Sequence, residues 1–257
     1  MSTGTTSPIS DSELVNLAKQ QYDQKQKSKI PSVVVNLTSK GKVYPESHPL
    51  RQGFVNMRHM TAYDEDIIVN ESYIEHGIMF DVLLAELITD DIAIEDIATV
   101  DRDGLIINAR RLGYGDDYPV SVINPKTGAT VNTNVKLSNL LVKDFNLEPD
   151  ENGEFEYSFD ADTKIKFRYR TNRQIPTDDP DKKISNYLKS IITEVNGDRD
   201  VVAIENFIKY NLSPINSKKF RTYYSEVAPS IITDIKVTGD NGDTFTAGFQ
   251  FDTGLFW

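Results

Sequence analysis

Carboxylates are the side chains of this sequence whose type and number could do chemistry. They gather in "DEDIIVNESYIEHG", residues 64–77, and in "ITDDIAIED", residues 88–96. A catalytic pair requires one carboxyl group with a raised pKa in a cleft, facing a second one at a defined separation. Here Asp64, Glu65, Asp66, Asp90 and Asp91 fall on the polar faces and first turns of predicted helices, where negative charge complements the helix dipole. We therefore expect these acids to be solvated and not catalytic.

Other patterns that could suggest a site have simpler structural interpretations. His59 and His76 are 17 residues apart, which matches no common metal-ligand spacing. "GYGDD" at 113–117 lacks the Lys-Ser/Thr of a phosphate loop and follows a predicted helix, so it is interpreted as a helix stop. "DNGD" at 240–243 lacks the ligand loop of a calcium site and suits a hairpin turn. No G-x-S-x-G motif occurs. We predict no catalytic, cofactor-binding or metal-binding residue.

Charge and composition narrow the classes of partner. The 28 Lys and Arg residues against 39 Asp and Glu give a net charge of −11, which repels nucleic acid and acidic membrane surfaces. The absence of cysteine excludes disulfides and thiolate metal sites, and only His48, His59 and His76 remain as imidazole ligands. No apolar run approaches the roughly 20 residues of a spanning helix, and the N-terminus does not resemble a signal peptide. A globular protein of the cytoplasm is expected.

Two predicted strands and two predicted helices open the fold after a polar leader at residues 1–28. Apolar alternation predicts strands in "IPSVVVNL" and around Phe54, Val55 and Met57. Helical spacing then runs from Met79 to Ile88, and Asp101 is the predicted N-cap of a second helix that Gly113 and Gly115 stop. A hairpin follows, "SVINPKTGATVNTNVKL", with its turn at Asn124–Gly128 and with Val120, Val122, Val131 and Val135 for packing.

A similar order of elements is expected in the rest of the chain. "FEYSFDADTKIKFRYR" predicts two strands with matching aromatic and aliphatic faces, and Glu154 and Glu156 lie opposite lysines or arginines of the second strand. After a Pro/Asp-rich link, Ile184 to Val195 predicts one amphipathic helix. Shorter helices follow at Ile204–Ile208 and Phe220–Val227, the latter capped by Asn216 or Ser217. A closing hairpin joins Ile231–Val237 to Phe245–Phe251 through a turn at 239–243.

These two runs predict an α+β fold of two similar halves. Each half has a β-hairpin or strand pair, a helical section and a closing hairpin, and the spacing from Asp101 to Gly128, 27 residues, nearly repeats from Asn216 to Gly242, 26 residues. We expect a flexible leader at 1–28, an N-terminal half at 29–147 and a C-terminal half at 148–257.

The C-terminus, "FDTGLFW", holds the one candidate binding site. Leu255, Phe256 and the single tryptophan, Trp257, could anchor a protein partner because large aromatic side chains dominate interfaces. Alternatively, they form an end segment tucked into the core of the chain itself.

Several segments, taken in order, resemble the baseplate hub and hub-assembly proteins of T-even-type contractile-tailed bacteriophages, which are also similar to tail-assembly chaperones. The segments are "LTSKGKVYPESHPL", "VNMRHMTAYDEDIIVNESYIEHG", "FDVLLAELI", "VDRDGLIINARRLGYGDDYPVSV", "SPINSKKFRTYYSEVAPSI" and "LFW", and they span residues 37–257.

The resemblance implies a late phage product without enzymatic activity. It would work through protein–protein contacts in the host cytoplasm during assembly and in the virion tail baseplate, with hub proteins and the tape-measure protein as partners; oligomerisation is left open. The resemblance also implies that relatives often carry Cys-x-x-Cys knuckles at the tips of these two hairpins, as in a zinc ribbon. Here those tips are "NPKTG" and "TGDNGD", so the hairpins would be cysteine-less zinc ribbons and no zinc is expected.

Two alternatives stay open from the sequence. The first is a transient tail-assembly chaperone that is absent from the mature virion. The second, of another class, is a small cytoplasmic enzyme with a cleft between the halves, which would require convergent buried polar groups.

Overall fold

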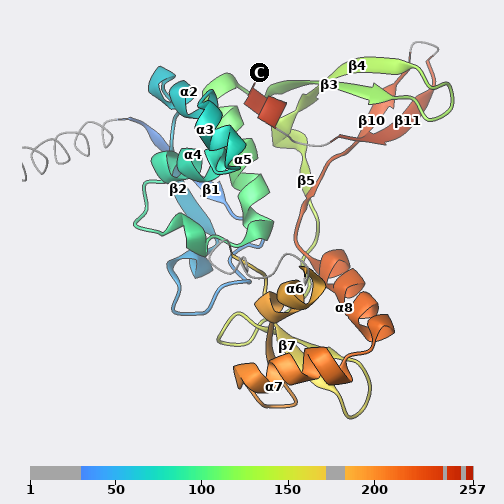
Figure 1. Cartoon of the computed structure of the whole chain (residues 1–257). Helices are drawn as coiled ribbons and strands as arrows, with labels where there is room; N and C mark the ends of the chain where they lie inside the picture. Colours follow the sequence, from blue (N-terminus) through green and yellow to red (C-terminus); the bar gives the residue numbers. More distant parts are fainter. Residues whose placement is uncertain (1–29, 172–182, 240–241, 250–252, 257) are drawn as a thin grey trace, which may run out of the picture.

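The computed structural model describes residues 30–171, 183–239, 242–249 and 253–256 (Figure 1). Within them the chain is α+β, with seven α-helices, four two-stranded antiparallel sheets and one three-stranded antiparallel sheet. No helix of the described part is long and apolar enough to cross a membrane. The predicted leader, the link at 172–182, Phe251 and Trp257 lie outside the described residues, and so do residues 240 and 241 of the terminal turn.

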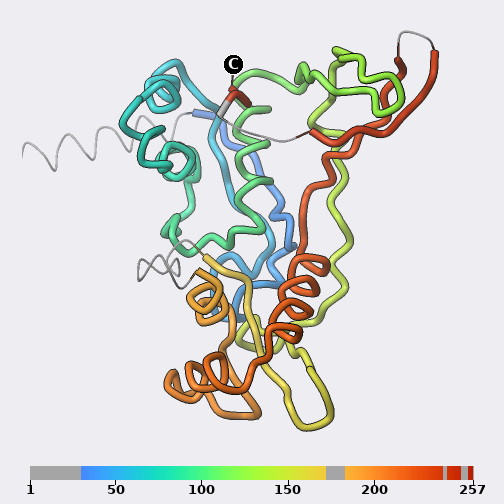
Figure 2. The backbone as a smooth tube through the Cα atoms, turned by 45° about the vertical axis from the view of Figure 1, so that its right-hand side comes forward, coloured from blue at the N-terminus to red at the C-terminus, as the bar shows by residue number. Residues whose placement is uncertain are grey.

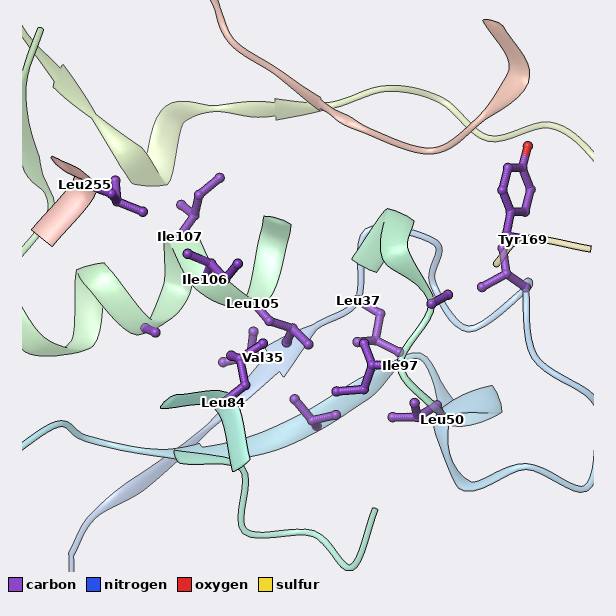
Figure 3. Packing of buried hydrophobic residues seen from close by; sticks show 14 of the residues in the cluster. Val35, Leu37, Leu50, Leu84, Ile97, Leu105, Ile106, Ile107, Tyr169 and Leu255 are labelled. Atoms are coloured by element: carbon purple, nitrogen blue, oxygen red, sulfur yellow. The ribbon is translucent and has the colours of Figure 1, made fainter. Parts of the chain in front are cut away.

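An N-terminal lobe, residues 30–114, packs helices on a two-stranded sheet (Figure 1). The sheet pairs β1 (Ser32–Asn36) with β2 (Phe54–Arg58), and Val35 lies opposite Val55. The helices are α2 (Ala62–Ile68), α3 (Glu71–Glu75), α4 (Met79–Leu87) and α5 (Thr99–Tyr114). Apolar residues at helical spacing in α4 and α5 bury against the sheet, among them Leu84, Leu105 and Ile106 (Figure 3). The strands and helices predicted for this region are therefore confirmed.

Two hairpins lie next to each other, to one side of the N-terminal lobe (Figure 1). The first joins β3 (Asp117–Ile123) to β4 (Thr130–Lys136), and the second joins β10 (Asp234–Thr238) to β11 (Thr244–Gly248). Val120, Val122, Val131 and Val135 are buried, as the alternation predicted. The hairpins touch each other, because Asn124 Nδ2 donates to Asp243 Oδ2 over 3.2 Å and the Tyr118 and Phe249 rings lie 6.1 Å apart.

A C-terminal lobe, residues 155–227, lies below the N-terminal lobe in Figures 1 and 2. Its core is rich in aromatic side chains. Its sheet has the order β6 (Phe155–Ser158), β7 (Lys164–Phe167), β8 (Ile192–Val195), and Phe155 lies opposite Phe167. The helices are α6 (Lys183–Ile191), α7 (Val201–Asn206), which runs into a π-turn at Phe207–Asn211, and α8 (Pro214–Val227). The rings of Phe167, Phe220 and Tyr224 pack against one another edge-on or tilted, with ring centres 5.5 to 6.3 Å apart.

A short ribbon links the hairpins to the C-terminal lobe. It pairs β5 (Leu141–Val142) with β9 (Ile231–Ile232), two segments that lie 90 positions apart in the sequence. Ile231 was predicted within the closing hairpin, and the structure instead places it in this ribbon. A register of only two residue pairs has no sequence signature long enough to detect.

The predicted helix Ile184–Val195 is wrong in its last turn. It ends at Ile191, and Ile192–Val195 forms β8 on the edge of β7. The four residues include Ile192, Thr193 and Val195, whose β-branched side chains suit a strand, and the ladder with β7 supplies their backbone hydrogen bonds. Glu154 also differs from prediction, since its carboxylate binds Arg199 and not a β7 cation, whereas Glu156 lies 3.4 Å from Lys164 as expected.

Three predicted helix boundaries are also corrected. Helix α5 begins at Thr99 after Ala98, so Asp101 is inside its first turn and is not the N-cap. It continues through Gly113 and ends at Gly115, whose φ of 88° favours glycine. Helix α8 is capped by Ser213, not by Asn216 or Ser217, and Pro214 occupies its first turn.

The loop 37–53 contacts the segment before β6. Glu46 N donates to Glu151 O, and Gly153, at φ 72°, lies so close that a Cβ there would be 2.6 Å from the carbonyl carbon of Tyr44. Gly77 has a similar φ of 68° with open space around its missing Cβ. The division of the chain at 147/148 and the internal duplication stay predictions.

Gly153→Ala should therefore lower the free energy of unfolding by at least about 1 kcal/mol more than Gly77→Ala. Both substitutions put alanine at a positive φ, but only the new Cβ at position 153 would clash with the Tyr44 backbone. Urea denaturation of the two variants checks this expectation. Equal losses would mean that the contact between Gly153 and Tyr44 does not constrain the fold.

Candidate functional site

Asp64 is fully buried, contrary to the expectation that it is solvated. Its carboxylate forms a bidentate ion pair with Arg58, with N–O distances of 2.8 and 2.7 Å. Thr61 N and Thr61 Oγ1 also donate to it, closing a capping box at the start of α2. Arg58 in turn donates to the backbone oxygens of Glu86 and His59. The pair therefore joins β2, α2 and the end of α4.

The pKa of Asp64 is lowered by this environment. Burial alone acts to raise it and is the largest single effect, but the hydrogen bonds from Arg58 and Thr61 and the charge of Arg58 together outweigh it. The pKa of Arg58 is raised, chiefly by its hydrogen bonds to Asp64. Both shifts favour the charged forms, and the oxygens of Asp64 are engaged by Arg58 and Thr61 within the fold.

Asp101 is a second buried carboxylate, on the first turn of α5. It accepts hydrogen bonds from Ser39 N at 2.6 Å, Ser39 Oγ at 2.7 Å and Tyr44 Oη at 2.8 Å. Tyr44 Oη itself accepts from Ala98 N at 3.0 Å. Burial raises the pKa of Asp101, and the hydrogen bonds from Ser39 and Tyr44 oppose the rise. Burial and the charge of Asp101 likewise raise the pKa of Tyr44.

A buried carboxyl with a raised pKa is a common sign of an active site, but here the geometry accounts for it. These donors all come from the loop 37–53, and the carboxylate, which is on α5, holds that loop to the helix. The chemistry that this arrangement supports is structural, since the acid faces its own donors and not a groove.

Among the other acids Glu154 is also buried and pairs with Arg199, and the three histidines lie apart from one another, with His48 and His59 partly buried and His76 exposed. His48 caps a short 3₁₀ turn at Pro49–Gln52, His59 Nδ1 lies 3.4 Å from Leu112 O, and His76 Nδ1 lies 2.7 Å from Ser72 O. Nowhere in the described residues do three or more His, Asp or Glu side chains gather so that they could hold a metal ion. At the first hairpin tip Asn124 Oδ1 accepts from Lys126 N, so this side chain shapes its own turn.

The structure places Leu255 and Phe256 in the interior, with exposed fractions of 0% and 2%. They belong to a 3₁₀ turn, Thr253–Phe256, that packs on α5 (Figure 3). Arg110 Nε donates to Leu255 O at 3.0 Å, and the Phe256 ring lies between those of Phe80 and Tyr114 at 6.2 and 6.0 Å. In the free chain Leu255 and Phe256 thus pack into the protein's own core, which is the second of the two arrangements considered from the sequence. Contact of these residues with a partner stays a prediction.

The β5–β9 ribbon presents apolar side chains that sequence reasoning missed. Leu141 is 67% exposed and Val142 is 44% exposed. Leu141 and Ile232 border a groove of about 300 Å³ on one face, and Val142 and Ile231 border a groove of about 500 Å³ on the other, next to α5. Lys236 lines the first groove and Lys40 the second. Short apolar runs in "NLLV" and "SIIT" were the available signal, but a two-residue ladder leaves no periodicity to detect.

Comparison with known proteins gives one match. A family model described as "T4 bacteriophage base plate protein" matches residues 30–244, which is most of the chain. This match confirms the resemblance inferred from the ordered motifs at the level of the family. The curated proteins and the solved structures give no match.

Replacing Asp64 with Asn should lower the free energy of unfolding by about 3 kcal/mol at pH 7, because Arg58 would be left buried without a counter-charge. The lowered pKa of Asp64 gives stability that is present above its unfolded-state value of about 4 and is lost as pH falls through the folded-state value. The difference in unfolding free energy between the Asp64→Asn variant and the original chain should therefore be smaller at about pH 3 than at pH 7. Urea denaturation at both pH values measures it.

The matched control is Asp66→Asn, an exposed acid on the same helix that should change stability by less than about 0.5 kcal/mol. Similar effects of the two substitutions would contradict the importance of the buried pair.

Proposed function

Because the chain belongs to the T4 bacteriophage base plate protein family, we propose that it is a non-enzymatic component of the central hub of the tail baseplate. It acts through contacts with other baseplate proteins. The observation that carries this proposal is the extent of the family match, since residues 30–244 include both lobes and three of the four strands of the two hairpins, β3, β4 and β10. Membership of the family supports a role in the baseplate, and the position in the central hub is our proposal.

The use of the titratable groups supports a role without catalysis. The two fully buried carboxylates, Asp64 and Asp101, are each saturated by donors that fix the backbone. An enzyme with a cleft between the halves would instead direct such groups toward a groove. No described contact favours that alternative.

The surfaces available to partners are apolar and exposed. The β5–β9 ribbon offers Leu141, Val142 and Ile232 beside two grooves, and a short antiparallel pair also has free strand edges that an incoming strand can extend. We propose that another baseplate chain covers this ribbon, with hub proteins and the tape-measure protein as the candidates. Association of several copies of this chain belongs to the same proposal.

Protein analysis of purified virions tests whether the chain is retained. We expect peptides of this chain in particles that have assembled in the host cytoplasm and been purified away from host protein. Consistent absence from intact particles would replace the structural role by the alternative of a transient assembly chaperone.

Leu141→Asp should reduce by at least about tenfold the recovery of identified baseplate proteins with the tagged chain from infected cells, since burying an unpaired carboxylate in an apolar contact costs more than about 1.4 kcal/mol. Ile215→Asp is the matched control, because Ile215 is 69% exposed on the separate helix α8. Equal recovery with both variants would remove the ribbon from the proposed interface.

Contact of a partner with the C-terminal residues Leu255, Phe256 and Trp257 remains a proposal, although Leu255 and Phe256 are buried in the described fold. Truncation would also remove the buried side chains of Leu255 and Phe256, so Trp257→Ala is the clearer variant in the same recovery experiment. Reduced recovery with unchanged thermal unfolding supports an anchor, and unchanged recovery assigns the segment to the chain's own core.

A further inference from the structure

An apolar groove of about 570 Å³ lies along the outer side of α4. It is lined by Ile78, Val82 and Ala85 of this helical region and by Ile92 and Ile94 after it, with Asp81 and Glu95 also in its lining. Ala85 and Ile78 are exposed, whereas Leu83, Leu84 and Leu87 of the same helix face the core. Helix α4 is thus apolar on both sides, and its outer side has no covering element among the described residues.

The surface around this groove is strongly acidic. Between His59 and Asp101 the sequence holds eleven Asp and Glu residues and neither Lys nor Arg. Arg58 and Arg102, just outside that stretch, pair with Asp64, Glu86 and Asp81. The exposed carboxylates of Glu71, Glu75 and Glu95 have no cationic partner within the described part of the chain. A segment that fits this groove should therefore combine apolar side chains with several positive charges.

The polypeptide enters the described fold next to α4. Pro31 O accepts a hydrogen bond from His59 N at 3.0 Å, and Ser32 lies opposite Arg58 in the β1–β2 ladder. Arg58 Nε in turn donates to Glu86 O of α4 at 3.0 Å. Residues 1–29 therefore directly precede the start of β1, which pairs with Arg58 of β2, and the Arg58 side chain contacts α4.

The sequence of residues 1–29 has the composition that the groove requires. Leu14, Val15 and Leu17 form its largest apolar group, and residues 19–29 contain four lysines and a single acid, Asp23. The 14 residues from Leu17 to Pro31 can span up to about 46 Å when extended, which exceeds the roughly 14 Å length of a nine-residue helix.

We propose that residues 14–29 of the same chain lie along α4, with the apolar group in the groove and the lysines against the surrounding carboxylates. The segment then covers the outer side of α4 and neutralises part of the acidic surface. This inference concerns the chain alone and does not rest on the role in the baseplate hub.

Disulfide trapping in the full chain tests the proposal, because the chain has no cysteine of its own. The double variant Ala18→Cys/Ala85→Cys should form an intramolecular disulfide at least about tenfold faster than the control pair Ala18→Cys/Thr246→Cys, since docking raises the local concentration of the two thiols. Thr246 is exposed on β11, in the hairpin pair and away from α4. Non-reducing electrophoresis and mass spectrometry of dilute protein follow the reaction.

A charge-reversal variant separates specific docking from random encounter. Adding Lys19→Glu, Lys25→Glu and Lys27→Glu to the first pair should slow trapping to the rate of the control pair, because these side chains would then repel the acidic helix. Equal trapping rates for the two original pairs, insensitivity to charge reversal, or a disulfide that joins two chains would each overturn the proposal.

Discussion

The buried carboxylate of Asp101 is the interaction on which the arrangement of the lobes depends. It accepts three hydrogen bonds from Ser39 and Tyr44, and these bonds fix the loop 37–53 against α5. The same loop contacts the segment before β6. There the backbone N–H of Glu46 donates to the backbone oxygen of Glu151, and the Tyr44 backbone packs on Gly153. The Asp101 carboxylate thus connects α5 of the N-terminal lobe, through the loop 37–53, to the segment before the first strand of the C-terminal lobe. Its hydrogen bonds to Ser39 and Tyr44 offset the free-energy cost of burying it.

A second long-range contact returns the end of the chain to the same helix. Arg110 on α5 holds Leu255, and Phe256 packs between Phe80 and Tyr114, so α5 receives both the loop before it in the sequence and the last turn of the chain (Figure 3). The two hairpins also touch through Asn124 and Asp243, 119 positions apart. Segments that are distant in the sequence therefore lie next to each other, as they also do in the β5–β9 ribbon, which has one groove on each of its faces.

This use of polar groups explains how a baseplate protein can be rich in acids and still present apolar contacts. The buried acids Asp64 and Asp101 accept structural hydrogen bonds, and the stretch between His59 and Asp101 carries acids without any Lys or Arg. The exposed apolar side chains Leu141 and Val142 lie on the ribbon, outside that acidic stretch. Partners of different charge can therefore be held by different faces. Such a division suits a protein whose family assembles with other proteins in a tail baseplate.

The sequence by itself determined the three hairpins, the main helices, the absence of cysteine chemistry and the family, because alternation, helical spacing and ordered motifs are properties of neighbouring residues. Tertiary structure alone decided that Asp64 and Asp101 are buried, that Ile192–Val195 leaves its helix, and that Leu255 and Phe256 turn inward. Each of these outcomes depends on an environment supplied by other segments, in the case of Leu255 by an arginine 145 positions away. The TAYD capping pattern at Thr61–Asp64 was a local signal for a bonded acid, but only the position of Arg58 in three dimensions makes that acid a buried ion pair.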